Sequence, residues 1–473
     1  MQTEAPRSMD PGNHTATFTR SVLDPMYEGL TRFNQQLQIV PALATELKAS
    51  SDATIWTAKL RQNVFFHDGS RLDPAAAAAS FTRLLDPARG LAGASSFRAA
   101  VQTVKPCGPE EICFFLKQPY AAMPNLLAIT PIVSPLGDLK RDLDRRADGT
   151  GPYVFSEWKT GDYVLEKRNE HYWGPKPKVR LLKWIWSTES SLMNMALVAR
   201  EIDLVNPLPP VFAEALCSDK NVRLIEGKSA AVFWIALNVL SKPLNDVRVR
   251  RALNYAIDRN ALIRSQLRGY GLPANSPLAP ADFAYDPAIR GYAYDLSKAK
   301  TLLSSAGCAK GFSLNLAVQE GQTGIAQAIA GMWAQVNVTL NIRQMETGVY
   351  AQSIFGGPQQ KRDQDIQAVF ASWTSSSLDA EYQLGPLYRT KSWAPAGANL
   401  GFYSNGRLDA ILNAAARELD LNRRKELYAQ AQEIIIADAP HVLLYYSKDL
   451  AAARATLKEP WIFPGGEVQL ENE

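Results

Sequence analysis

The sequence predicts an α/β protein built from two lobes, and three observations predict it. The chain has 473 residues, 46% of them hydrophobic, and a single core rarely sustains so long a chain. Strand-like runs alternate with helix-like runs, which is typical of α/β lobes. If the late strand-like run that begins at 441 rejoins the first lobe, the chain crosses between the lobes twice, near 234–238 and near 440–446. Two crossings predict a hinge.

The first lobe opens with a strand, a turn and a helix. The alternating run at 56–60 predicts a strand, Asp68-Gly69 predicts a tight turn, and Asp73 followed by Pro74 predicts a helix start. Further strands are expected at 101–120, a hairpin at 149–169 with its turn at 159–162, and a strand–helix–strand run at 181–205.

The second lobe repeats this alternation. A buried strand is expected at 230–240, and apolar residues at helical spacing predict helix across 244–263. The alternation resumes at 293–345, two amphipathic helices are expected at 408–440, and a strand starts at 441. We expect residues 1–235 plus 445–473 to form the first lobe, with a small subdomain at about 35–148, and residues 236–444 to form the second.

Composition excludes several function classes. The net charge is only +4, and no basic run suggests a nucleic-acid partner. No stretch of about 18 uninterrupted apolar residues predicts a membrane span. The start, MQTEAPRSMDPGNH, lacks the order of an export signal, so either the protein is not exported or its signal is absent from this sequence.

The cysteines point to an oxidising compartment. Cys107 and Cys113 flank GPEEI at two strand ends, and facing strand positions bring Cβ atoms to disulfide distance. A Cys107–Cys113 disulfide is therefore expected, with two unpaired thiols as the alternative. Cys217 and Cys308 lie in separate segments, and their pairing stays open.

No catalytic apparatus is visible. The sequence has no GxSxG elbow, HExxH, P-loop, or GxGxxG that opens a helix. The adjacent glutamates of GPEEIC point to opposite faces of a strand and cannot share a substrate. We therefore expect neither an enzyme nor a cofactor.

Several segments together resemble one family, the peptide, glutathione and nickel class of solute-binding proteins that serve ABC importers (family 5, cluster C). They are ALATELKASSDATIWTAKLRQNVFFHDGSRLDPAAAAASFTRLLDP, GTGPY (149–153), NEHYWG (169–174), EIDLV (201–205), LNDVRVRRALNYAIDRNALI (244–263) and YDLSKAKTLLSSAG (294–307). The resemblance implies a two-lobed periplasmic-binding-protein fold with an extra small domain in the first lobe and a ligand cleft between the lobes. It also implies a monomeric periplasmic receptor whose partner is an importer permease, with membrane contact only through that permease or a lost lipid anchor.

WTSSSLDAEYQLGPLY (373–388) looks most like the glutathione-binding branch of this family. Free-peptide binders place an aspartate three positions after the tryptophan, where it pairs with the ligand's α-ammonium. Here that position is Ser376, whose neutral hydroxyl cannot supply a charge-assisted bond. The resemblance aligns Asp379 with an acid that helps to hold the loop, so it would bind ligand only if the loop is rearranged.

The candidate ligand-binding residues follow from this strip and its surroundings. We expect Trp373 to stack on a ligand and the hydroxyls of Ser375, Ser376 and Ser377 to form hydrogen bonds with it; the alternative is that Trp373 fills the core and the serines cap the next helix. The other candidates in this region are Asp379, Tyr382 and Tyr403. Arg20 and Arg98 could each pair with a ligand carboxylate, or they could be solvated surface residues. His14 could be a ligand to a metal chelate, or it could be a surface histidine.

The remaining histidines offer no protein-only metal site. His67 and His171 lie in FHDG and NEHYWG, which the resemblance marks as folding signatures, and no two histidines share a helix face. The leading hypothesis is a receptor that delivers glutathione, or a short or modified peptide, to an ABC importer. The alternatives are a receptor for nickel or another metal in a small organic chelator, and a peptide hydrolase.

Overall fold

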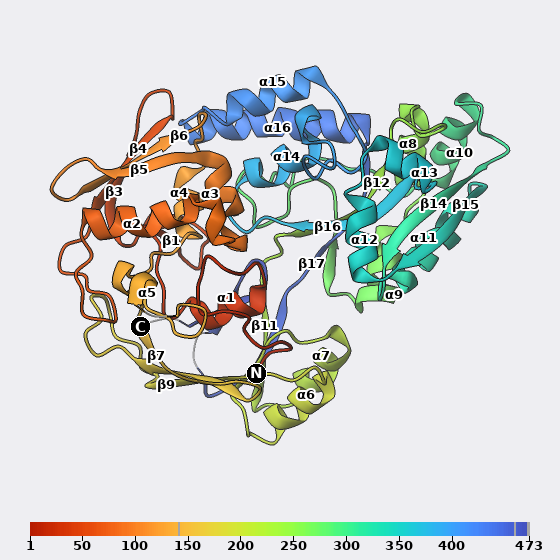
Figure 1. The fold of residues 1–473 in the computed structure, drawn as a ribbon. Coiled ribbons are helices and arrows are strands. Elements are labelled where there is room, and N and C mark those ends of the chain that lie inside the picture. The colour runs from red at the N-terminus through yellow and green to blue at the C-terminus, as the bar shows by residue number, and fades with distance from the viewer. Residues whose placement is uncertain (141, 458–459, 471–473) are drawn as a thin grey trace. The chain divides into compact units, whose positions relative to one another are not determined.

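The computed structural model describes residues 1–140, 142–457 and 460–470. By its internal contacts the chain divides into two compact units, Met1–Lys228 with Asp449–Glu473 (unit 1) and Ser229–Lys448 (unit 2). Figure 1 shows the ribbon of the chain, with labels on its helices and on many of its strands.

Unit 1 contains several small sheets. Its four-stranded antiparallel sheet has the order β3-β4-β6-β5, and two three-stranded sheets have the orders β7-β8-β9 and β10-β18-β11. The strands are β1 (Thr31–Phe33), β2 (Ile39–Pro41), β3 (Ala44–Ala49), β4 (Ile55–Leu60), β5 (Val101–Pro106), β6 (Glu111–Leu116), β7 (Tyr153–Lys159), β8 (Tyr163–Arg168), β9 (Leu181–Ile185), β10 (Leu204–Val205), β11 (Val222–Glu226), β18 (Leu450–Arg454), β19 (Pro460–Phe463) and β20 (Glu467–Leu470). The helices are α1 (Thr17–Leu23), α2 (Pro74–Leu85), α3 (Ser95–Ala100), α4 (Met123–Ala128), α5 (Pro135–Lys140), α6 (Ser190–Val198) and α7 (Pro210–Cys217).

The four-stranded sheet and α2 enclose a core of their own, built from buried side chains between Leu30 and Ile132. As predicted, α2 starts at Pro74, and the Asp73 side chain caps it by accepting a hydrogen bond from the Ala76 N–H. The predicted disulfide is confirmed, because Cys107 and Cys113 are bonded next to the β5–β6 turn. Cys217 and Cys308 are free thiols.

Three of the segments that carried the family resemblance, those with His67, Gly151 and Asn169, contact one another in unit 1. The glycines of GTGPY let the chain approach residues 25–26, since a Cβ on Gly149 would lie 2.2 Å from the Met26 carbonyl oxygen. The His67 ring forms a hydrogen bond with the Gly151 carbonyl, and the Trp173 indole donates to the Glu28 carboxylate. These contacts are structural, as we expected for His67.

Unit 2 is built on one mixed six-stranded sheet with the order β13-β17-β12-β16-β14-β15. The pairs β14/β15 and β14/β16 are parallel, whereas β12 runs antiparallel to both β16 and β17. The strands are β12 (Ala231–Leu237), β13 (Gly271–Pro273), β14 (Phe312–Gln319), β15 (Val338–Met345), β16 (Ala368–Thr374) and β17 (His441–Ser447). The helices are α8 (Val247–Tyr255), α9 (Arg259–Leu267), α10 (Leu296–Ser305), α11 (Thr323–Ala334), α12 (Thr347–Ile354), α13 (Pro358–Asp363), α14 (Ala380–Tyr388), α15 (Gly406–Ala415) and α16 (Leu421–Asp438).

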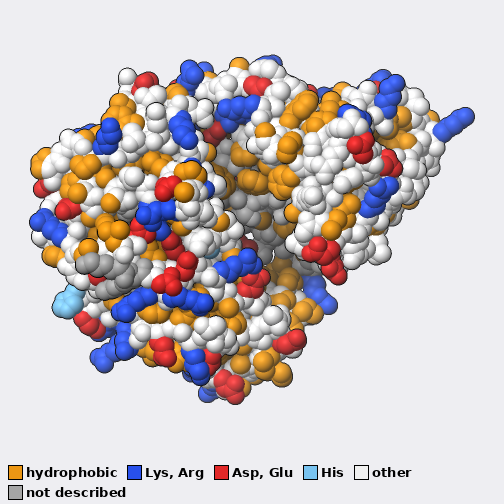
Figure 2. Space-filling model, viewed as in Figure 1, with side chains coloured by type: hydrophobic (Ala, Val, Ile, Leu, Met, Phe, Trp, Pro, Cys, Tyr) orange, Lys and Arg blue, Asp and Glu red, His pale blue; other side chains and the backbone are white. Residues whose placement is uncertain are grey.

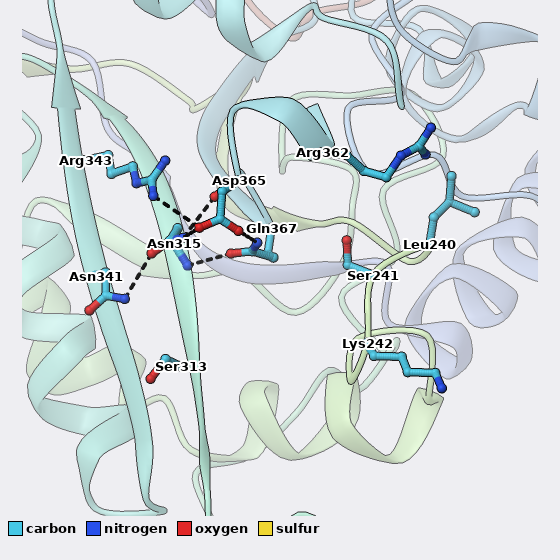
Figure 3. A pocket seen from close by; sticks show the side chains of 10 residues that line it. All are labelled: Leu240, Ser241, Lys242, Ser313, Asn315, Asn341, Arg343, Arg362, Asp365 and Gln367. Carbon is cyan, nitrogen blue, oxygen red and sulfur yellow. Dashed lines mark hydrogen bonds and ion pairs between the residues drawn. The ribbon is translucent and has the colours of Figure 1, made fainter. Parts of the chain in front are cut away.

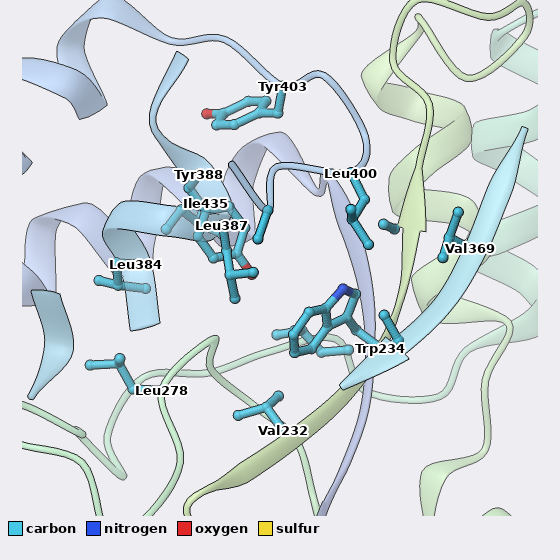
Figure 4. Close-up of a cluster of buried hydrophobic side chains, with 14 of the residues drawn as sticks. Val232, Trp234, Leu278, Val369, Leu384, Leu387, Tyr388, Leu400, Tyr403 and Ile435 are labelled. Carbon is cyan, nitrogen blue, oxygen red and sulfur yellow. The ribbon is translucent and has the colours of Figure 1, made fainter. Parts of the chain in front are cut away.

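Helices cover both faces of this sheet. One face contributes Ile235, Leu237 and Phe370 to a core shared with α8 to α11. The other contributes Val232, Trp234 and Val369 to a core shared with α12 and α14 to α16, drawn in Figure 4. Helices α15 and α16 run side by side (Figure 1).

The two connections between the units differ from the expected ones by a few residues. The expected boundaries, at 235/236 and 444/445, fall inside β12 and β17, whereas the units meet at 228/229 and 448/449. The reason is physical: β12 and β17 pair within one sheet, and a boundary inside these strands would divide that sheet between the two units.

Charged side chains of both signs are interspersed on the face of the molecule shown in Figure 2, which suits a protein with a small net charge. In the described part of the chain, no helix combines the length and the apolar character that a membrane crossing requires.

Candidate functional site

The strip singled out in the sequence forms the end of β16, a short loop and the start of α14. In β16, Trp373 pairs with Val232 and Thr374 pairs with Ala231 of β12. Strand β12 begins just after the first connection to unit 1, and β17 ends just before the second. Trp373 and Thr374 therefore lie at the end of the unit 2 sheet from which both connections leave.

Trp373 is held in place but only half buried. Its indole N–H donates to the Tyr382 carbonyl oxygen at 3.2 Å, and the two rings lie 6.2 Å apart. One side of Trp373 packs against the core cluster of unit 2. Tyr382 is also half buried, so both rings keep exposed surface for a ligand to contact.

The three serines that follow have different environments. Ser375 and Ser377 are fully buried, and the Ser375 hydroxyl donates to the Asp379 carbonyl oxygen at 3.4 Å. Ser376 is half buried and keeps part of its surface exposed. Of the three, Ser376 is the one a solute reaches without rearrangement of the loop.

Asp379 has a structural role. Its carboxylate caps α14 by accepting from the Glu381 N–H and also forms a bidentate ion pair with Arg424 of α16, at 2.7 and 2.9 Å. Both side chains are almost completely buried, at 0% and 3% exposure. Because the charge of Asp379 is already compensated inside unit 2, we leave it out of the proposed ligand contacts.

A second buried acid supports the same loop. Asp282 accepts a hydrogen bond from the Ala279 N–H at 2.8 Å, and the neighbouring Phe283 N–H donates to the Leu378 carbonyl oxygen. Burial raises the pKa of Asp282 to about 8, although the hydrogen bond from the Ala279 N–H favours ionisation. At neutral pH its carboxyl is therefore mostly protonated.

Tyr403 lies within the core cluster of Figure 4 and is 4% exposed. Its hydroxyl donates to the Asp438 carboxylate at 2.6 Å, so both the ring and the hydroxyl are used inside unit 2. Tyr403, Ser375 and Ser377 are therefore left out of the proposed contacts as well.

The two arginine candidates in unit 1 already interact with other groups of the protein. Arg20 forms ion pairs with Asp24 and Glu467, each at 3.5 Å. Arg98 donates to the backbone carbonyls of Leu84 and Leu91. Both guanidinium groups hold local structure, which does not favour a role in binding a ligand carboxylate.

His14 is half buried and neutral. Burial, followed by the nearby charge of Arg20, lowers the pKa of His14 to about 4. Its Nδ1 is buried and has no hydrogen-bond partner among the described residues, so a solute would reach it only after a local rearrangement.

Sequence reasoning missed Arg424 and Asp282, the two residues that support the loop. The signal for Arg424 lay in its spacing, since it precedes the buried Tyr428, Ala431 and Ile435 on one helical stripe of α16. A charge on an apolar stripe predicts a buried partner. Nothing in the local sequence marked Asp282.

The described residues contain no group of three or more His, Cys, Asp or Glu side chains that could hold a metal ion. The exposed surface near Trp373 offers aromatic rings and a hydroxyl, which suit binding by stacking and hydrogen bonds.

Comparison with known proteins decides the family. A family profile described as bacterial extracellular solute-binding proteins, family 5 Middle, matches residues 38–395. The chain belongs to this family. This family 5 protein is therefore a solute-binding protein, as the sequence motifs predicted.

Its curated relatives include the glutathione-binding protein GsiB of Salmonella typhimurium, which is 30% identical over 465 residues, covering 97% of this chain and 90% of the relative. GsiB of Escherichia coli strain K12 matches with the same identity and coverage. These relatives are binding proteins and not enzymes, in line with the absence of catalytic motifs.

Solved structures confirm the α/β, two-lobed periplasmic-binding-protein fold. The structure of HbpA2 from Haemophilus parasuis matches with a TM-score of 0.88 and 24% identity, covering 99% of both chains. A periplasmic binding protein, DppA from Helicobacter pylori, described as ABC transporter-associated and in complex with the peptide STSA, matches with a TM-score of 0.79 and 26% identity, covering 99% of this chain and 97% of that one. NikZ from Campylobacter jejuni in complex with Ni(L-His), at 23% identity and a TM-score of 0.78, covering 98% and 96%, shares the fold.

Proposed function

We propose that this protein is a monomeric receptor in the periplasm, or on the outer face of the cell membrane, that delivers a peptide-like solute to the permease of an ABC importer. Glutathione and short or modified peptides are the solutes it fits best. The observation that carries the proposal is the 30% identity to glutathione-binding GsiB over 97% of the chain. The peptide bound to the H. pylori DppA supports the same solute class.

The proposed contacts in unit 2 are Trp373, Ser376 and Tyr382, the candidates in the strip that keep exposed surface. The aromatic rings provide stacking surface, and the Ser376 hydroxyl both donates and accepts hydrogen bonds. A hydroxyl at this position favours a solute whose ammonium group is not the main anchor, because Ser376 cannot form a charge-assisted bond with it.

Binding needs no covalent chemistry. Two connections, at 228/229 and 448/449, join the units, and we propose that a bound solute shifts the protein toward a closed arrangement about them. Such a shift requires that the solute interact more strongly with the closed state than with the open one. The permease would recognise the closed state.

A second candidate function is binding of nickel held in a small organic chelator, and one observation favours it. Burial lowers the pKa of His14 to about 4, so its imidazole is uncharged at neutral pH, as a ligand to a cargo metal requires; because its Nδ1 is buried, a chelate would bind there only after a local rearrangement. Calorimetric titration with nickel plus free histidine tests it. Saturable binding that His14→Ala removes would support this function over the first.

Thermal-shift screening tests the leading proposal. Glutathione, short peptides and S-modified glutathione, each at millimolar concentration, should include at least one compound that stabilises the protein. Ser376→Ala should reduce this stabilisation, whereas Ser372→Ala should not, because the exposed Ser372 lies on the same strand but faces away from Trp373. No stabilisation by any of these compounds would argue against the proposal.

A further inference from the structure

Unit 2 carries a second hollow, away from Trp373, on the edge of its sheet. Figure 3 shows this pocket, which encloses about 710 Å³. Its lining residues are Leu240, Ser241, Lys242, Ser313, Asn315, Asn341, Arg343, Arg362, Asp365 and Gln367. Nine of these ten are polar or charged, whereas small-molecule sites are usually lined mainly by apolar side chains.

The strand register explains the polar lining. In the parallel pair β14/β15, Asn315 faces Asn341, and side chains alternate between the two faces of the sheet. Leu314 and Leu316 are buried in the core beneath α11, so their neighbours Ser313 and Asn315 point to the opposite face. The edge strand β15 adds Asn341 and Arg343 to that face.

One side of the pocket is fixed by a hydrogen-bond network around Asp365. Its carboxylate accepts bonds from the side-chain amides of Asn315 and Gln367, both at 2.5 Å, and pairs with Arg343 at 3.3 Å. The Asn341 amide in turn donates to the Asn315 side-chain oxygen at 2.9 Å. The Arg343 guanidinium lies beside this carboxylate and offsets part of its charge.

The other side carries positive charge. Lys242 and Arg362 are both exposed, and Figure 3 shows them across the pocket from Asn341 and Arg343. Together with Arg343 they give three cations against one acid in the lining. The pocket as a whole is therefore an anion-attracting surface.

We propose that this pocket is a docking surface for an acidic polypeptide segment of the importer's membrane subunit. The proposal rests on the proposed function, which requires such a partner. Charge complementarity selects the occupant: carboxylates of an acidic segment would meet Lys242 and Arg362, while the amides of Asn341 and Gln367 form hydrogen bonds with its backbone. A rim of exposed charges of this kind acts on the rate and specificity of docking.

A charge reversal tests the proposal. The double variant Lys242→Glu/Arg362→Glu, carried by the chromosomal copy in the source bacterium, should lower uptake of labelled glutathione by about tenfold or more, because like charges then oppose each other at the interface. The purified variant should bind glutathione with unchanged affinity. Lys300→Glu/Lys310→Glu is the matched control, since both lysines are exposed in unit 2, lie outside the pocket, and give the same change in net charge.

The possible outcomes separate the two proposals. Unchanged uptake by the pocket variant, or an equal loss in the control, would overturn the docking proposal. A loss of glutathione affinity in the pocket variant would also overturn it, because the pocket would then belong to the solute site. If the wild-type protein binds none of the candidate solutes, the proposed function fails instead.

Photocrosslinking provides a measurement that does not depend on the solute. A benzophenone amino acid replacing exposed Ser313 should crosslink in intact cells to a membrane subunit of an importer, at a peptide richer in Asp and Glu than in Lys and Arg. The same replacement at exposed Lys300 should not. The proposal would be overturned if no importer subunit is crosslinked. It would also be overturned if the protein co-sediments with phosphatidylglycerol vesicles and Lys242→Glu/Arg362→Glu abolishes this co-sedimentation, because the pocket would then bind lipid.

Discussion

Arg424 and Asp379 form a bidentate ion pair, with nitrogen–oxygen distances of 2.7 and 2.9 Å, that joins α16 to the loop before α14. The two side chains are 3% and 0% exposed, so water does not screen the pair. This contact anchors the end of the loop that carries Ser376.

Replacing either partner of this ion pair should destabilise unit 2. Asp379→Asn keeps an oxygen that can cap α14, but it leaves the Arg424 charge buried without its counter-ion. We expect the free energy of unfolding of unit 2 to fall by about 3–5 kcal/mol. Chemical denaturation measures this change.

The matched control is Glu426→Gln, on the same helix, which removes an ion pair with Arg423 whose partners are 61% and 55% exposed. Its effect should stay below about 0.5 kcal/mol. A change of less than about 1 kcal/mol for Asp379→Asn would show that the pair does not hold the loop.

Trp373 should contribute to solute binding through its exposed ring. Trp373→Ala is expected to weaken binding of the stabilising solute by about tenfold or more. Trp393→Ala is the control, because Trp393 is also half buried in unit 2 and donates its indole N–H to a backbone carbonyl, that of Tyr403, at 2.7 Å. Calorimetry distinguishes the two, and equal losses would indicate a general effect on folding.

Glu166 predicts a pH-dependent loss of stability in unit 1. It is fully buried in β8, and burial raises its pKa well above the ordinary value of 4.5, while the nearby indole N–H of Trp184 opposes the shift. Because the folded pKa is the higher one, the stability that the neutral carboxyl provides is complete below about pH 4.5 and is lost as pH rises through the folded pKa.

The neutral variant Glu166→Gln should therefore be more stable than the wild type at pH 8, by more than about 1 kcal/mol, and this gain should vanish toward pH 4. Thermal unfolding across this pH range measures the difference. Glu214→Gln, at an exposed position of α7, should show no such dependence. A gain that is constant with pH would argue against titration of Glu166.

The Cys107–Cys113 disulfide closes a short loop, with a sequence separation of 6. For so small a loop, chain entropy predicts that the bond stabilises the small four-stranded core by about 2 kcal/mol. Denaturation of Cys107→Ser/Cys113→Ser should show that loss. Cys217→Ser, which removes an exposed free thiol, should be neutral, and a neutral double variant would contradict the prediction.

Local chemistry explains which parts of the fold could be predicted. Asp73 and Pro74 start α2 because a cap and a fixed φ act within one helical turn, and the hairpin turn falls between Lys159 and Tyr163 as its sequence indicated. The disulfide was predictable because its two cysteines flank one short turn, so their pairing also depends only on local sequence. In 244–263, helical spacing concealed a break, since Asp258 caps a second helix, α9.

Long-range pairing explains what could not be predicted in the candidate site. Asp379 is bound by a residue 45 positions away, and Tyr403 by one 35 positions away, so no local pattern indicated that they were already bonded. The loop that contains the buried Ser375 and Ser377 is likewise bonded to a distant segment, since the Phe283 N–H donates to the Leu378 carbonyl oxygen. The sequence indicated the correct strip, but only tertiary contacts show which of its side chains keep exposed surface.

Calorimetric titration of the purified protein with glutathione tests the central claim most directly. The account predicts saturable binding of one glutathione per chain, weakened by Trp373→Ala and unaffected by Trp393→Ala. The account would be contradicted if the protein binds neither glutathione nor short peptides but binds nickel plus histidine saturably.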